Sequence, residues 1–184
     1  MVSRGWTTIL VYILDKRIVQ GDGIEKTAVC LGIAVAGCEL PTELVGRHGL
    51  SRRLHVRGER PEYRFYYRDR LPRLPIWRDG RLQVARWGNG RGQSRSLPRT
   101  GWTWLETARS GGWRGSGAIP VDIPANYGLE RRGVWYLIEV GVRGLLVPDE
   151  RGSAVVYVLC EPSSHYYRVM TGSERMPVFI DQRI

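Results

Sequence analysis

VWYLIEVGVRGLLV at residues 134–147 and AVVYVLC at residues 154–160 are the two stretches that decide the fold. Branched aliphatic and aromatic residues dominate both, which favours strands. Residues 148–152, with the sequence PDERG, lie between them and are rich in turn-forming residues. The three segments together predict two long strands joined by a turn.

Shorter strands and few helices are predicted in the rest of the chain. An Asp-Gly pair at residues 79–80 is a strong signal for a two-residue hairpin turn. Thr103 and Glu106 fit a capping box, in which an N-cap hydroxyl and an acid three residues later satisfy each other's backbone N–H groups. The pattern indicates a β-rich α+β domain. Its further predicted strands are residues 31–36, 74–77, 82–87 and 178–180, and its predicted helices are residues 39–49 and 103–108. Residues 60–73 are predicted to be an arginine- and tyrosine-rich connecting segment, and residues 89–100 an exposed loop.

The first 29 residues differ in composition from the rest. Lys16 and Lys26 are the chain's two lysines, whereas the 155 residues from Cys30 on contain 24 arginines and no lysine. Valine codons can also start translation, and Val29 directly precedes Cys30. We therefore expect residues 1–29 to be an N-terminal extension, upstream of the true start or removed, and residues 30–184 to form one domain. A chain that begins at Cys30 carries a 1,2-aminothiol.

The chain is strongly basic, with a net charge of +10 and a pI near 10.1. Residues 30–184 alone keep +9, because 24 arginines face 15 acidic residues. This charge predicts a polyanionic partner, with nucleic acid as the first candidate and an anionic membrane surface as the second. Arginine in particular favours bidentate phosphate contacts and stacking.

The cysteines and histidines give no sign of a metal site. Cys30, Cys38 and Cys160 form no Cys-x-x-Cys pair, and the three histidines lack ligand spacing. The cysteine pattern indicates a reducing cytoplasm, and no apolar run reaches the ~20 residues of a membrane span. We expect a cytoplasmic monomer without cofactor, metal or membrane contact.

IPANYGLE at residues 123–130 resembles the Pro-Ala-Asp-Gly-(aromatic)-(aromatic)-Glu-Trp motif of the SOS-response-associated peptidase (SRAP) family, whose members shield abasic sites in single-stranded DNA. The resemblance extends over residues 30–184 and includes no part of residues 1–29. It implies an SRAP-like fold of curved, partly barrel-like antiparallel sheets and a role in the DNA-damage response. The other partial matches follow in family order at Leu74-Pro75-Ile76, Trp87-Gly88, Glu106-Thr107 and Arg175-Met176-Pro177-Val178.

The resemblance also implies a set of catalytic residues. The family's cysteine directly follows the initiator methionine, the place that Cys30 takes if translation begins at Val29. Its α-amine would form an imine with the aldehyde of a ring-opened abasic site, and its thiol would close a thiazolidine. Glu130 matches the family glutamate and would move protons. Ser173 stands at the family histidine position, and His165 is the candidate substitute.

A structural alternative stays open for each of these residues. Cys30 could be a small buried strand residue, Glu130 a solvent-facing acid and His165 a structural histidine. Departures from the family also occur at residues 102–104, where Trp-Thr-Trp replaces Asn-Ala-Arg. Three hypotheses follow. The first is covalent capture of abasic sites, with the family's lyase and self-processing activities left open. The second is a non-catalytic single-stranded nucleic-acid-binding module with a degenerate site, and the third and weakest is a small-molecule enzyme on the same scaffold.

Single-stranded DNA binding needs basic groups beside aromatic faces on which bases stack. Trp77, in the predicted hairpin, is expected in the core, whereas Trp102 and Trp104 fit either a core or a DNA-stacking position. The alternative is that the tryptophans are core residues and the arginines a solvated surface. The candidate DNA-binding residues are Trp87, Arg91, Arg95, Trp102 and Trp104, around the 89–100 loop, and Arg175.

Overall fold

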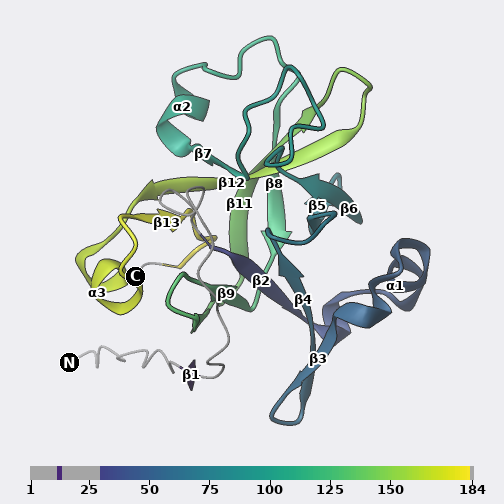
Figure 1. Cartoon of the computed structure of the whole chain (residues 1–184), viewed down its shortest axis with the longest axis vertical. Helices are drawn as coiled ribbons and strands as arrows, with labels where there is room; N and C mark the ends of the chain where they lie inside the picture. The colour runs from purple at the N-terminus through teal and green to yellow at the C-terminus, as the bar shows by residue number, and fades with distance from the viewer. Residues whose placement is uncertain (1–11, 14–29, 183–184) are drawn as a thin grey trace, which may run out of the picture.

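The computed structural model describes residues 12–13 and 30–182 and is β-rich (Figure 1). The first sheet has the strand order β1-β10-β9-β2-β4-β3, and all of its pairs are antiparallel. The expected extension over residues 1–29 lies outside the described residues, apart from β1. The strands of this sheet are β1 (Tyr12–Ile13), β2 (Gly32–Ala36), β3 (Leu54–Arg57), β4 (Arg60–Tyr66), β9 (Tyr127–Leu129) and β10 (Val134–Leu137).

The second sheet closes on itself. Its order is β11-β8-β5-β6-β12-β13, and β11 also pairs with β12, so that β11, β8, β5, β6 and β12 form a barrel. β12 runs parallel to β6 and to β7, which corrects the expectation of purely antiparallel sheets. The strands are β5 (Arg73–Arg78), β6 (Arg81–Trp87), β7 (Trp102–Trp104), β8 (Ile119–Pro124), β11 (Gly141–Pro148), β12 (Ala154–Pro162) and β13 (Arg175–Pro177).

The described helices are short. Helix α1 ends where the sequence predicts, because Gly49 adopts the left-handed backbone (φ 61°) that favours glycine at a helix end. Among the described residues no helix has the length and apolar character needed to cross a membrane. The α-helices are α1 (Thr42–His48), α2 (Leu105–Arg109) and α3 (His165–Thr171), and the 3₁₀ turns are η2 (Gly37–Glu39) and η3 (Leu50–Arg53).

Several local predictions are confirmed. Strand β2 and most of β12 lie where expected, and the turn between β11 and β12 includes residues 149–152. The hairpin of β5 and β6 turns at Asp79 and Gly80, whose φ angles of 50° and 70° fit the type I′ turn that Asp-Gly favours. The coarse expectation of a β-rich α+β fold with few short helices is therefore confirmed.

Three predictions about strands and connections are wrong in extent. Residues 134–147 form two strands, because β10 pairs with β9 in the first sheet and β11 with β8 and β12 in the barrel. Residues 60–73 are not only a connection, because β4 occupies their first half. The arginines there suggested a loop, but the buried Glu62 binds Arg57 at 2.9 Å and Arg64 at 2.7 Å. The last strand, β13, precedes the predicted residues 178–180.

The capping box at Thr103 is also wrong. Trp104 is the N-cap of α2 and has no side-chain capping bond, while Thr103 Oγ1 accepts from Trp113 Nε1 at 2.9 Å. The 89–100 loop is only partly exposed, because Asn89 is buried and hydrogen-bonds within it. Trp77, expected in the core, is 44% exposed.

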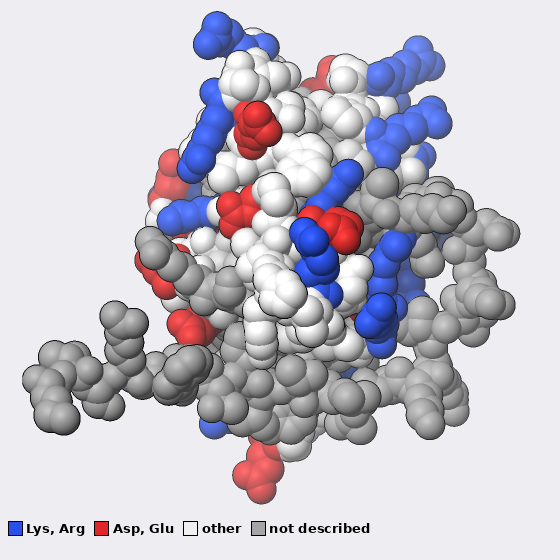
Figure 2. Space-filling view, turned by 90° about the vertical axis from the view of Figure 1, so that its left-hand side faces the viewer, with Lys and Arg blue, Asp and Glu red and all other residues white. Residues whose placement is uncertain are grey.

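Basic side chains are spread over the surface rather than gathered in one place. Figure 2 shows arginine side chains projecting from several parts of one face, with acidic side chains between them. A binding site must therefore be sought from local geometry.

Candidate active site

Cys30 and Glu130 lie against each other although 100 residues separate them in the chain. The Cys30 backbone N–H donates to Glu130 Oε1 at 2.8 Å. Strand pairing produces this contact, because β2 runs antiparallel to β9 with Gly32 opposite Leu129. The residues just before β2 and just after β9 must then be neighbours. The structure thus brings together the two principal residues of the predicted site.

The backbone of Cys30 is held in the left-handed region, with φ at 55°. A residue with a Cβ rarely adopts this conformation, which costs about 1–3 kcal/mol. The side chain is fully buried, and its thiol donates to Gly32 O at 3.2 Å. Burial, followed by the Glu130 carboxylate, raises the pKa of the thiol to about 12. The thiol is therefore protonated at neutral pH in the 184-residue chain and is a poor nucleophile.

The Glu130 side chain is buried and receives three hydrogen bonds. Besides the Cys30 N–H, the Tyr167 hydroxyl donates to Oε1 and the Ser173 hydroxyl to Oε2, each at 2.7 Å. Burial raises the pKa of Glu130 above its usual value near 4.5, and the hydrogen bonds from Ser173, Tyr167 and Cys30 offset part of this rise. A carboxyl group with a raised pKa exchanges protons closer to neutral pH, as general acid–base chemistry requires.

Helix α3 and the turn after it position the two hydroxyls. Ser164 caps α3, and its Oγ accepts from the Tyr167 N–H at 3.0 Å. Gly172, with φ at 73°, ends the helix. The Ser173 N–H then donates to Thr171 Oγ1 at 3.1 Å. The backbones of Tyr167 and Ser173 are therefore held by local hydrogen bonds that do not involve the carboxylate.

Tyr136 adds a buried hydroxyl to the site. Its ring packs edge-on against Tyr167, with 5.3 Å between ring centroids. Its oxygen makes no hydrogen bond with any residue in the described part of the chain. Leaving a buried polar group unpaired costs about 1–3 kcal/mol. The site therefore contains both a strained backbone and an unsatisfied hydroxyl, features that the packing around them must maintain.

Gly128 makes room for Tyr136, and we expect Gly128→Ala to lower the free energy of unfolding by about 1–3 kcal/mol. The added Cβ would come within 2.3 Å of the Tyr136 ring and hydroxyl. Denaturant titration measures the change. Gly46→Ala is the matched control, because nothing lies within 4 Å of its added methyl group on α1 and it should stabilise by about 0.5–1 kcal/mol. Equal effects of the two substitutions would contradict the prediction.

The remaining predicted catalytic residues divide into one that reaches Glu130 and one that does not. Ser173 contacts the carboxylate, whereas His165 is exposed at the start of α3, and no hydrogen bond or ion pair in the described residues joins it to Glu130. Sequence reasoning missed Tyr136 and Tyr167. The available signal for Tyr167 was a serine three residues earlier, which fits a helix N-cap.

Two of the predicted DNA-binding tryptophans are core residues. Trp87 is fully buried, and its indole N–H donates to Gly101 O at 3.1 Å. Trp102 is 7% exposed and packs against Tyr67, with 4.4 Å between ring centroids. Both rings are buried, which corrects the assignment of Trp87 to DNA binding and makes Trp102, which fitted either position, a core residue.

The other predicted DNA-binding residues reach the surface. The Arg175 guanidinium lies over the half-buried Trp104 ring, 4.4 Å from its centroid. Arg91 is exposed, but its guanidinium donates to the backbone carbonyls of residues 68–69. Arg95 is exposed, and its backbone N–H donates to Glu150. Trp104 and Arg175 are thus the predicted pair that the structure brings into contact.

No group of three or more histidine, cysteine or acidic side chains in the described residues is placed to hold a metal ion. The arrangement offers instead a buried carboxylate directed at the nitrogen of a buried cysteine.

No protein-family model matches the chain, and neither the curated proteins nor the solved structures give a significant match.

Proposed function

We propose that this protein binds single-stranded DNA and captures abasic sites covalently through Cys30, in the form of the chain that begins at this residue. The observation that supports the proposal is the 2.8 Å hydrogen bond from the Cys30 nitrogen to Glu130. In the 184-residue chain this nitrogen belongs to the peptide bond with Val29 and has no available lone pair. An N-terminal Cys30 would place an amine, whose unperturbed pKa is about 7.7–8.0, beside the same carboxylate.

The chemistry needs only proton transfers. The amine nitrogen adds to the C1′ aldehyde of a ring-opened abasic site and gives a carbinolamine. Glu130 takes the proton from the nitrogen and returns it to the departing hydroxyl, so that water leaves and an imine forms. The Cys30 thiol then adds across the C=N bond, with sulfur joining carbon and the proton joining nitrogen. The product is a five-membered thiazolidine, and water is the sole by-product.

Ser173 and Tyr167 serve as positioning residues in this proposal. Both donate to the Glu130 carboxylate at 2.7 Å and so fix its orientation toward Cys30. Ser173 stands where the resemblance implies a histidine, and a serine hydroxyl does not accept a proton readily near neutral pH. Proton transfer therefore depends on Glu130.

A second function is favoured by the full burial of Cys30 and by the serine at position 173. It is a non-catalytic module that binds single strands through its arginines. The affinity of such a module for DNA falls as the salt concentration rises, because binding releases counterions from the phosphates. It depends neither on Cys30 nor on an abasic lesion.

We expect a covalent adduct when the chain that begins at Cys30, after removal of an initiator methionine, is mixed with a single-stranded oligonucleotide containing one abasic site. A denaturing gel measures the adduct. The 184-residue chain should give none, because its Cys30 nitrogen is an amide, and an intact strand should give none with either form. If the chain that begins at Cys30 binds the strand but forms no adduct, the non-catalytic binding module would be supported instead.

A further inference from the structure

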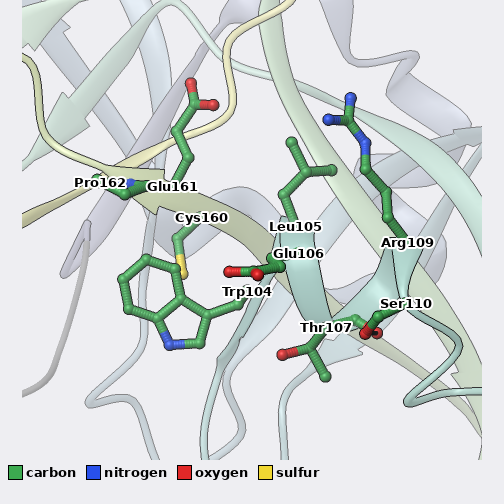
Figure 3. A pocket seen from close by; sticks show the side chains of 9 residues that line it. All are labelled: Trp104, Leu105, Glu106, Thr107, Arg109, Ser110, Cys160, Glu161 and Pro162. Carbon is green, nitrogen blue, oxygen red and sulfur yellow. Dashed lines mark hydrogen bonds between the residues drawn. The ribbon is translucent and has the colours of Figure 1, made fainter.

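A pocket of about 690 Å³ opens between α2 and β12, away from the Cys30–Glu130 contact (Figure 3). One wall is the indole of Trp104, and Cys160 contributes from β12. Glu106 and Glu161 bring two carboxylates to a pocket of a chain whose net charge is +10. Arg109 also lines the pocket, so its walls carry charges of both signs. The two carboxylates supply hydrogen-bond acceptors beside an aromatic ring, so the pocket suits a flat ligand that carries hydrogen-bond donors.

The carboxylate of Glu106 is not engaged in any interaction that stabilises the fold within the described residues. The capping function that the sequence suggested is absent, because α2 begins without a side-chain cap. Glu106 is exposed, and no hydrogen bond or ion pair in the described part of the chain engages its carboxylate. Figure 3 shows this carboxylate on the same side of the pocket as the Trp104 ring. One face of the Trp104 ring is covered by the Arg175 guanidinium. A flat ligand would therefore stack on the other face, beside the free Glu106 carboxylate.

The pocket is linked to the candidate active site through a short piece of chain. The Arg175 guanidinium lies on the Trp104 ring, and Arg175 follows Ser173 by two residues. Two residues of extended chain span at most about 7 Å. Ser173 itself donates to Glu130. A DNA strand whose abasic residue is at Cys30 would therefore place a nearby nucleotide within reach of Trp104.

We propose that this pocket holds a guanine base close to the abasic residue, an inference that rests on the proposed function. Unstacked bases bind by stacking on aromatic side chains and by hydrogen bonds along their Watson–Crick edge. Guanine has two adjacent donors on that edge, N1–H and N2–H, and a carboxylate accepts two parallel hydrogen bonds. Thymine has one donor between two acceptors, and adenine and cytosine each set an acceptor beside their amino group. Glu106 thus favours guanine.

The test uses the 184-residue chain, because it concerns binding and not the reaction of Cys30. Fluorescence anisotropy would compare a labelled oligothymidylate with the same strand carrying one central guanine. We expect the guanine strand to bind about tenfold tighter, as a good bidentate contact would give. Glu106→Gln should remove this preference, because the glutamine amide N–H would face the N1–H or N2–H donor of guanine. The affinity for oligothymidylate should stay nearly unchanged. Glu59→Gln, an exposed carboxylate on the β3–β4 turn, should keep the preference.

The outcomes separate the base assignment from the proposed function. Equal affinity for the two strands, or a preference that survives Glu106→Gln, would overturn the guanine site and leave DNA binding intact. Failure of both strands to bind would overturn the proposed DNA binding and, with it, this inference. Glu106 lies at the surface, so its substitution is not expected to prevent folding, and a thermal melt of each variant checks this.

Discussion

Cys30→Ala is expected to abolish the stable adduct completely in the chain that begins at this position. An N-terminal alanine keeps the amine and forms an imine with the aldehyde, but it has no thiol to close the thiazolidine. The imine hydrolyses on a denaturing gel unless a borohydride reductant traps it. We therefore expect no band without reductant and a band with it. This pair of measurements separates the role of the amine from that of the sulfur.

Two other cysteines provide matched controls for this prediction. Cys38 is exposed and Cys160 is buried, and neither lies at the proposed N-terminus. Cys38→Ala and Cys160→Ala should both retain the adduct, because an internal cysteine has an amide nitrogen. An adduct from the Cys30→Ala chain that persists without reductant would contradict the thiazolidine mechanism and point to another nucleophile.

The strands could be predicted from the sequence where local signals were sufficient, and not where pairing decided the outcome. The Asp79-Gly80 turn and the Gly49 helix end depend on backbone preferences of a few residues, and both predictions were confirmed. The division of residues 134–147 depends on β10 and β11 pairing in different sheets. Strand β4 depends on its pairing with β3, which lets Glu62 neutralise Arg57 of β3 as well as Arg64 of β4.

The candidate site shows the same division. Cys30, Glu130 and Ser173 were named from the order of motifs along the chain, and the structure places all three in one hydrogen-bonded group. The two tyrosines were missed, because their burial depends on how α3 and β10 pack. Trp87 was assigned to DNA and Trp102 was left open between core and DNA, because composition alone does not distinguish a buried aromatic cluster from an exposed one.

Glu130→Gln is expected to slow adduct formation by about 10²–10⁴-fold in the chain that begins at Cys30, the usual contribution of a general acid–base group. Glutamine keeps the shape of the side chain and can still accept from the Cys30 nitrogen and the Tyr167 hydroxyl. It cannot take up the proton that the amine loses on attacking the aldehyde. Single-turnover kinetics with an excess of protein over abasic strand would measure the rate.

The pH dependence of this rate identifies the group responsible. Burial raises the pKa of Glu130, and the carboxylate base forms as the pH rises through that value. The rate of the unsubstituted protein should therefore increase there, and again as the amine deprotonates. The unperturbed pKa of an α-amine is about 7.7–8.0, and the adjacent carboxylate moves the second increase to higher pH. Glu130→Gln should retain only the second increase. Glu139→Gln, which changes an exposed carboxylate between β10 and β11, should retain both. A Glu130→Gln protein with both increases and an undiminished rate would remove Glu130 from the mechanism, and the burial of its carboxylate beside Cys30 would then be structural.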